Sequence, residues 1–353
     1  MTEHAGRGSG QDTMPNSTDR LETRVTRVFG IRYPIIQGGL ARVARAELAA
    51  AVSNAGGLGQ IAMAGVGTTP ELMRAEIRKA KALTDAPFAV NFPIGHLNID
   101  PHLDVVVEEG VAAVSLTRGD PRPAIRRLAG TGIRVLVLVS GPEQARKAEQ
   151  AGADAVATVG YEGGGHLGRG DLTTFVGVPL VADALSIPFV AGGGVADGRG
   201  LAAALALGAD GVEIGTRFIA VREAFAHDKY KAALLRATNT VIVKRLLDQP
   251  GRALANQWTR DYLEAEARGT PRDELLDMVK AEANERGVYH GDVDGSLLWA
   301  GQGAALIEDI PTARELIERM VAEARTSASR LWSLADGHPP VTSDRVQKSL
   351  QIG

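Results

Sequence analysis

Eight short apolar runs, each followed by a segment with helical spacing, constrain the fold of this chain more than any other feature. They are almost continuously apolar, as parallel strands buried on both faces tend to be. The runs are residues 34–37, 58–62, 88–92, 112–116, 134–139, 155–160, 188–192 and 211–215. The amphipathic segments between them include residues 42–53, 70–83, 142–150 and 198–207. Strand-then-helix units in this succession predict an α/β fold, a closed (β/α)8 TIM barrel formed by residues 22–222.

The pattern changes after the last of these units. Residues 223–295 contain no convincing strand and several charged helical patterns, such as 270–283. We therefore expect a smaller C-terminal helical domain inserted there, which would cap the barrel. A long helical pattern at about 312–331 predicts that residues 296–335 return and pack on the barrel.

Composition and charge narrow the classes of function. The chain has no cysteine and a formal net charge of -3. Disulfides and cysteine-bound metals are therefore excluded, and there is no electrostatic reason to expect nucleic acid or an anionic membrane as a partner. No apolar run approaches the roughly 18 residues of a membrane helix. The polar ends, residues 1–21 and 336–353, predict a disordered lead without a signal peptide and a polar tail. We expect a cytoplasmic protein.

A glycine-rich loop after the sixth predicted strand surrounds His166. Its glycines at 163, 165 and 168 match the dinucleotide pattern G-x-G-x-x-G, but that motif needs a helix directly after it and an acidic residue about 20 positions on. The next helical pattern starts only near residues 172–175, and the following strand ends in three glycines. We therefore reject the dinucleotide interpretation.

Barrel geometry gives His166 a different role. Residues that follow barrel strands form the C-terminal face, where barrel active sites lie. An imidazole with an ordinary pKa near 6.5 can give or take a proton there. The alternative is that His166 caps a helix or binds a phosphate, and the residue pattern leaves both open.

Two further glycine-rich loops indicate a phosphate-bearing ligand. Residues 191–198 follow the seventh predicted strand, and Gly215-Thr216-Arg217 follows the eighth. Barrels frequently bind phosphate with these two loops, through backbone N–H groups and hydroxyl donors. Gln37 and Asn91 stand at the ends of the first and third strands, where their amides suit the polar edge of a flavin ring or simply cap loops.

Together these motifs resemble the nitronate monooxygenase (2-nitropropane dioxygenase-like) family. The resemblance rests on five stretches: residues 33–39 (YPIIQGG), 54–59 (NAGGLG), 162–166 (EGGGH), 191–198 (AGGGVADG) and 215–218 (GTRF). It covers nearly all of residues 22–333. The family consists of FMN-dependent TIM-barrel oxidoreductases, so the resemblance implies FMN as the cofactor, with NAD(P)H as a further co-substrate in some members.

The resemblance also implies roles for individual residues. His166 would be the catalytic acid or base beside the flavin. The cofactor-binding positions would be Gln37, Gly38, Gly39, Asn91, Glu162, Gly165, Gly193, Gly194, Gly215 and Thr216. No metal is expected. Some members carry a lysine or glutamine facing the flavin on the fifth strand, and this chain has Leu138 there.

Three activities occur within the family, and each predicts a different small-molecule substrate. The first expectation is oxidation of alkyl nitronates with oxygen to a carbonyl compound and nitrite. The alternatives are an NAD(P)H-dependent enoyl-(acyl-carrier-protein or CoA) reductase, which residues 256–261 and 290–295 resemble, and an NADH:quinone reductase. A flavin-binding protein without turnover, and a homodimer, also stay open.

His290 is the second histidine of interest because it stands where the inserted domain returns to the barrel. It could reach the mouth of the cleft and contact a nucleotide or thioester. It could equally be a hydrogen-bonding hub at the domain interface.

Overall fold

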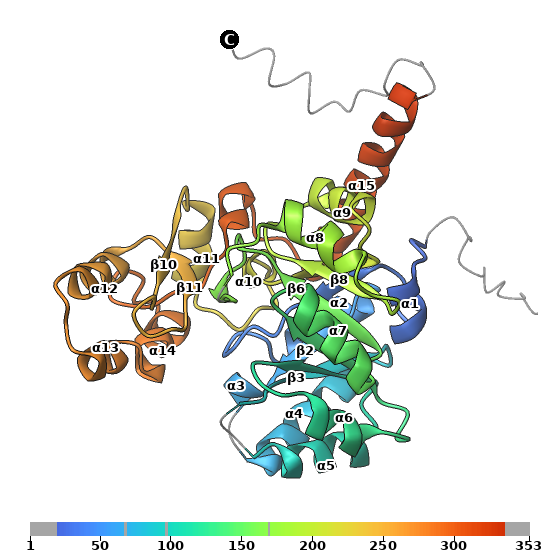
Figure 1. The fold of residues 1–353 in the computed structure, drawn as a ribbon, viewed down its shortest axis with the longest axis horizontal. Coiled ribbons are helices and arrows are strands. Elements are labelled where there is room, and N and C mark those ends of the chain that lie inside the picture. Colours follow the sequence, from blue (N-terminus) through green and yellow to red (C-terminus); the bar gives the residue numbers. More distant parts are fainter. Residues whose placement is uncertain (1–19, 67–68, 96–97, 169, 336–353) are drawn as a thin grey trace, which may run out of the picture.

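Eight parallel strands close into a barrel in the computed structural model, which describes residues 20–66, 69–95, 98–168 and 170–335 (Figure 1). The strands are β1 (Ile35–Gln37), β2 (Gly59–Ala62), β3 (Phe88–Pro93), β4 (Ala113–Thr117), β5 (Arg134–Val139), β6 (Ala155–Val159), β8 (Phe189–Gly192) and β9 (Gly211–Ile214). Their order is β1-β9-β8-β6-β5-β4-β3-β2, and a parallel bridge between Ile36 and Leu58 joins the two ends. The predicted (β/α)8 barrel is confirmed.

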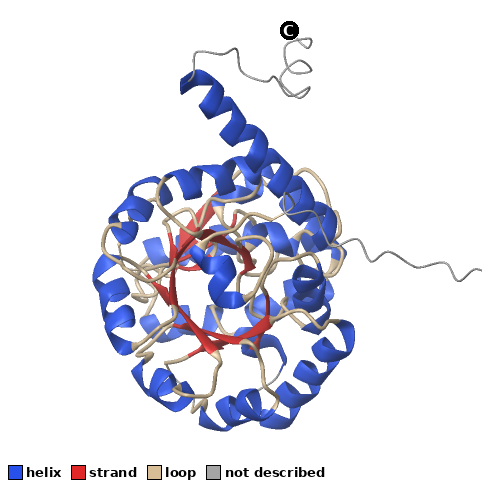
Figure 2. Cartoon of the chain, turned by 90° about the vertical axis from the view of Figure 1, so that its right-hand side faces the viewer, coloured by secondary structure: helices blue, strands red, loops and turns tan. Residues whose placement is uncertain are grey.

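Helices surround this ring of strands, as Figure 2 shows from the end opposite the cap. They are α2 (Ala46–Asn54), α3 (Met63–Val66), α4 (Pro70–Leu83), α5 (Asp100–Glu108), α6 (Arg122–Leu128), α7 (Pro142–Ala151), α8 (Thr174–Ala182), α9 (Gly198–Ala206) and α10 (Thr216–Ile219). Helix α4 shows why they form. The side chain of Thr69 accepts a hydrogen bond from the N–H of Leu72, and Met73, Ile77 and Ala80 make one buried stripe.

The long C-terminal helix α15 (Ala313–Ala335) packs on α9 and α2, as its pattern predicted. The close approach of α15 to α9 depends on Gly198 of α9, because a Cβ at this position would lie 2.1 Å from the carbonyl oxygen of Met320 in α15. Within the described ranges no helix is long and apolar enough to cross a membrane. The predicted lead, up to residue 19, and the predicted tail, 336–353, lie outside the described residues.

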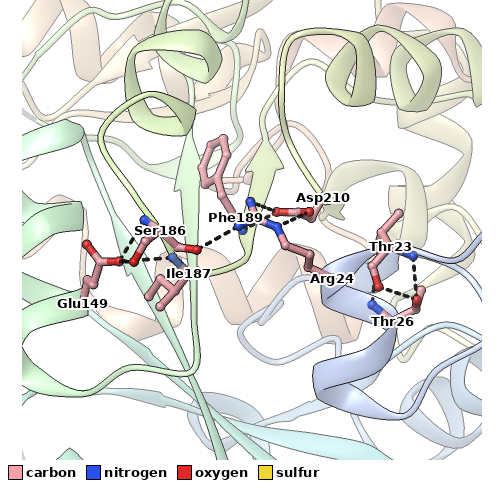
Figure 3. A network of polar contacts seen from close by, with 8 residues as sticks. All are labelled: Thr23, Arg24, Thr26, Glu149, Ser186, Ile187, Phe189 and Asp210. Atoms are coloured by element: carbon pink, nitrogen blue, oxygen red, sulfur yellow. Dashed lines mark hydrogen bonds and ion pairs between the residues drawn. The ribbon is translucent and has the colours of Figure 1, made fainter.

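A short helix, α1 (Arg24–Phe29), closes the N-terminal end of the barrel. It begins with a capping box in which Thr23 and Thr26 bond each other's backbone N–H groups, and its apolar face packs into the barrel interior. Arg24 donates to both carboxylate oxygens of Asp210, at 2.8 and 2.7 Å, and to the carbonyl of Ser186 (Figure 3). This end of the barrel is a packed plug.

The cap over the other end contains strands, so the expectation of no strand in residues 223–295 is wrong. Strands β10 (Thr240–Val243) and β11 (Gly251–Leu254) pair antiparallel, and β11 pairs with β7 (Gly165–His166) of the glycine-rich loop. Each cap strand has only four residues, and the third strand of the sheet, β7, lies far away in sequence, which is why the sequence pattern did not indicate this sheet.

The rest of the cap is helical (Figure 1, yellow to orange). Its helices are α11 (Asp228–Leu235), α12 (Gln257–Ala267), α13 (Arg272–Met278) and α14 (Ala281–His290). The single helical pattern expected at 270–283 is thus divided between α13 and α14. The cap has an apolar cluster of its own, in which Trp258 stacks on Tyr262 at 5.2 Å between ring centres. A 3-10 turn, Gln302–Leu306, leads back to α15.

Candidate active site

A cavity of about 350 Å³ lies at the C-terminal ends of the barrel strands, beneath the cap. This size falls within the range of small-molecule and cofactor sites. Nine of the residues predicted from the sequence line it together: Gly38, Gly39, Asn91, Gly165, His166, Gly193, Gly194, Gly215 and Thr216. Asn91 lies within β3, and the others come from the segments that follow β1, β6, β8 and β9. They meet because all eight strands are parallel and point their C-terminal ends at one face.

Three other predicted residues do not line this cavity. Gln37 is fully buried beneath it, where its Oε1 accepts the N–H of Gln60 at 2.9 Å. Glu162 accepts the N–H and the hydroxyl of Thr174 at 2.8 and 2.9 Å, which fixes the glycine-rich loop to the start of α8. The carboxamide of Gln37 and the carboxylate of Glu162 thus accept hydrogen bonds from other residues of the protein. They hold neighbouring segments in place and do not line the cavity.

His290 also lies outside the cavity. It is the last residue of α14, it is exposed, and it makes an edge contact with Tyr289 at 6.5 Å between ring centres. Within the described residues its side chain makes no hydrogen bond, so the structure does not show the interface hub, and the contact with a nucleotide or thioester stays a prediction.

The loop that carries His166 is held between barrel and cap. Residues Gly165 and His166 pair with Arg252 and Gly251 of β11, and the guanidinium of Arg252 donates to the carbonyl of Tyr161 at 2.9 Å. Gly165 has a φ of 76°, which a residue with a side chain rarely adopts. The next helix, α8, starts only at Thr174, several residues after the glycines. A dinucleotide motif needs a helix directly after its glycines, so this spacing agrees with rejecting that interpretation.

The cap also brings Lys244 onto His166, a contact that the sequence reasoning missed. Its Nζ lies 3.1 Å from Nε2 of His166, and Lys244 is only 5% exposed. The residue directly follows β10 and has a φ of 66°, an uncommon conformation for a lysine. Trp299 completes the cluster, with its ring 5.1 Å from the imidazole and 5.8 Å from the lysine nitrogen. No motif in the sequence relates Lys244 to His166.

Burial and neighbouring positive charge set the protonation of this pair. Desolvation, followed by the charges of Lys244 and Arg118, lowers the pKa of His166 to about 3. His166 lines the cavity and remains exposed as a residue, and its lowered pKa keeps the imidazole neutral at neutral pH. Desolvation and Arg118 lower the pKa of Lys244 to about 8, so its ammonium form prevails at pH 7.

The contact between the Lys244 ammonium and His166 determines the tautomer of the histidine. An ammonium group can only donate, so Nε2 of His166 accepts from Lys244 and the ring proton resides on Nδ1. The side chain of Arg118, after β4, lines the same cavity. The site therefore combines a neutral imidazole with two cationic groups, an arrangement suited to a ligand with a negatively charged or polarised oxygen.

A chain of polar side chains crosses the barrel below the cavity. Asn91 donates to Ser115 at 2.6 Å, Ser115 donates to Gln60, and Gln60 donates to Glu213 at 3.0 Å. Burial raises the pKa of Glu213 to about 7, although the bond from Gln60 acts in the opposite direction. Asn91 and Glu213 both line the cavity, so its inner wall is polar while Leu138 and Trp299 provide apolar surface.

No group of three or more His, Cys, Asp or Glu side chains in the described part of the chain is arranged to hold a metal ion.

Comparison with known proteins finds one family model, similar sequences and similar solved structures. The family model "Nitronate monooxygenase" matches residues 22–98 and 94–323. A nitronate monooxygenase of Pseudomonas aeruginosa is 39% identical, over 86% of this chain and 100% of the relative. A methyl-oxo-octahydroindene carboxyl-CoA dehydrogenase of Mycobacterium tuberculosis is 34% identical, over 90% of this chain and 100% of the relative. The solved structure of FabK from Thermotoga maritima superposes with a TM-score of 0.84 at 37% identity, covering 89% of this chain and 99% of that one.

Proposed function

Because the chain belongs to the nitronate monooxygenase family and is an oxidoreductase, we propose that its cavity holds FMN and that it oxidises alkyl nitronates. The observation that carries the proposal is the cluster of neutral His166 with two cationic side chains: His166 and Arg118 line the cavity, and Nζ of Lys244 lies 3.1 Å from Nε2 of His166. A nitronate is a small anion with two oxygens, and two cationic side chains complement its charge.

The residues of the cavity fit a flavin phosphate. Gly193 and Gly194 have φ angles of 91° and 75°, so their loop exposes backbone without side chains, and a residue with a Cβ would be strained there. The hydroxyl oxygen of Thr216 accepts the N–H of Gly301 at 2.8 Å, which leaves its own O–H free to donate to a phosphate oxygen. Asn91 and Glu213 would face the polar edge of the ring, and Leu138 its apolar surface.

A bound flavin would supply the two-electron chemistry. For a nitronate the protein's part is to hold the anion, and for a neutral nitroalkane it must also accept one proton from carbon. Lys244 now donates to Nε2 of His166, and it can turn its ammonium to a substrate oxygen instead. Nε2 is then free to take a proton from the carbon of a neutral nitroalkane while Lys244 and Arg118 stabilise the developing negative charge. Trp299 fixes the imidazole plane during this exchange.

Reduction of an enoyl thioester is the second candidate, since similar proteins include FabK and a carboxyl-CoA dehydrogenase. The same ammonium group of Lys244 would then stabilise the enolate oxygen of the thioester, and His166 would hold the proton for the α-carbon. The segment 223–295 would act as the cap that excludes water in either case.

The test is the anaerobic visible spectrum of the protein with FMN, before and after each candidate reductant. Bleaching of the band at about 450 nm, typical of oxidised flavins, by ethylnitronate but not by NADH or NADPH supports the nitronate reaction. Rapid bleaching by a nicotinamide nucleotide supports the reductase. If the protein shows no flavin band after incubation with FMN and desalting, the proposal is overturned. The variant Lys244→Met tests the role of the ammonium group, because it should keep the flavin band and slow the bleaching of that band by the nitronate.

A further inference from the structure

A second cavity, of about 420 Å³, lies at the seam between barrel and cap. Its lining comes from Arg45 before α2, from residues 224–227 before α11, and from Val288 and Tyr289 of α14. Two backbone hydrogen bonds hold the three segments together: Phe225 N–H to Val43 at 3.2 Å, and His227 N–H to Val288 at 2.8 Å. The walls are therefore fixed by main-chain contacts and not by side chains alone.

The walls present flat surfaces of the kind that stack on aromatic heterocycles. The Phe225 ring is 45% exposed and meets the Tyr289 ring edge-on at 5.8 Å. The guanidinium of Arg45 lies 3.8 Å from the centre of the Phe225 ring. Such guanidinium and phenyl planes can stack on the π-face of any nucleic-acid base.

Unused hydrogen-bonding groups lie in the same walls. Nε of Arg45 is buried and makes no hydrogen bond within the described residues, which is costly unless a ligand provides an acceptor. Nδ1 of His227 accepts the N–H of Lys229 at 3.1 Å, so the ring proton of the neutral tautomer lies on Nε2, where it can be donated to a heterocycle nitrogen. Arg45 also brings a fixed positive charge, which complements a phosphate.

This second cavity adjoins the first at α14. Val288 lines both, and α14 also contributes Asn284 to the cavity under the cap. A ligand with its reactive end beside His166 could therefore extend along α14 and place its other end against Phe225 and Arg45. A compact nitronate would leave the second cavity empty.

We propose that the pocket of Arg45, Phe225, His227 and Tyr289 binds the adenine ring of a nucleotide co-substrate whose other end enters the active-site cavity. The proposal rests on the oxidoreductase function above and adds a recognition site to it. Two co-substrates share this chemistry, a nicotinamide adenine dinucleotide and a coenzyme A thioester. In both, an adenosine phosphate lies at the far end of the molecule from the reacting atoms.

The first experiment is isothermal titration of FMN-saturated protein with 5′-AMP, so that AMP cannot occupy the flavin phosphate site. We expect saturable binding that Phe225→Ala and Arg45→Met each weaken by about tenfold or more, in line with the loss of a base-stacking contact. Phe175→Ala is the matched control, since Phe175 is 74% exposed and lines neither cavity. Absence of binding, or binding unchanged in both pocket variants, overturns the proposal.

The second experiment distinguishes the two sources of adenine. The KM of NADH is compared with that of reduced nicotinamide mononucleotide, and the KM of crotonyl-CoA with that of crotonyl-pantetheine, in wild type and Phe225→Ala. If the pocket serves the dinucleotide, the variant raises the KM of NADH toward that of the mononucleotide; if it serves coenzyme A, the thioester pair converges instead. Turnover of either substrate with no such convergence overturns the proposal.

The two proposals fail separately. AMP binding is measured without turnover, whereas the proposed function depends on the flavin spectrum. A protein that binds FMN and oxidises nitronate but does not bind AMP would leave the proposed function intact and remove the adenine pocket.

Discussion

The two ends of the barrel are closed by different means. At the N-terminal end, α1 inserts Val25 and Phe29 into an apolar cluster, and the polar contacts around it are partly exposed. At the C-terminal end, the cap covers a cavity with a buried lysine on a neutral histidine. The first arrangement gains stability from burial of apolar surface, whereas the second keeps charged groups away from water at a cost in stability. The N-terminal end thus contributes to folding stability, and the C-terminal end holds the site that we propose to be active.

Replacing His166 by Ala should have the largest effect. With a neutral nitroalkane as substrate, loss of a group that transfers a proton lowers kcat by about 10²- to 10⁴-fold, while the flavin spectrum and the melting temperature change little because the ring lines the cavity. Steady-state kinetics and thermal unfolding of the FMN-bound protein measure both. Turnover retained within a few-fold would show that another group carries the proton.

At the opposite end, Phe29→Ala should affect stability and leave chemistry intact. Phe29 is 4% exposed within the barrel plug, and truncation of a buried phenylalanine costs about 3–5 kcal/mol. Denaturant unfolding should show this loss, with kcat per flavin unchanged. A large fall in kcat at full flavin occupancy would contradict the separation of the two ends.

Lys244→Met should lower kcat/KM for the nitronate by roughly 10- to 100-fold, comparable to the 1.5–3 kcal/mol of a hydrogen bond to a charged group. The pKa of Lys244 is about 8 in the folded protein and lies below its ordinary value. The ammonium form is therefore lost as pH rises through about 8, and wild-type activity should fall there.

The pH profile of the variant provides the decisive comparison for Lys244. Activity of Lys244→Met should be flat across pH 7–9, and Lys244→Arg should keep its charge and part of its activity above pH 8. Linkage adds a stability signature: because the unfolded chain binds more protons than the folded one between about pH 8 and 10.5, wild-type stability should rise with pH in that window relative to Lys244→Met. Identical pH profiles would mean that Lys244 takes no part.

The smallest effect is expected for Arg24→Met in the barrel plug. The side chain of Arg24 is 44% exposed, so solvent screens its paired hydrogen bonds to Asp210, and the loss should be about 0.5–1 kcal/mol. Urea unfolding at low and high salt measures it, with the difference between wild type and variant shrinking at high salt. A loss as large as that of Phe29→Ala would mean that polar contacts also carry the stability of this end.

Much of the barrel could be predicted because its signals are local. A buried parallel strand is a continuous apolar run, an outer helix has a period of 3.6, and the glycines at 193, 194 and 215 mark loops that approach a ligand. Once the strands are known to be parallel, their C-terminal ends must share one face, so His166, Asn91 and the glycine loops had to meet there. The sequence thereby determined the barrel and most of the cavity lining.

Only the tertiary structure decided what covers that cavity. Strands β10 and β11 have four residues each and gain their stability by pairing with each other and with the histidine loop. Gln37 and Glu162 have residue types suited to a ligand, yet neighbouring N–H groups already occupy them. Lys244 lies 78 positions from His166 along the chain, and that contact exists because the cap folds back over the barrel. Periodicity reports which face of an element is buried, but not which distant element covers it.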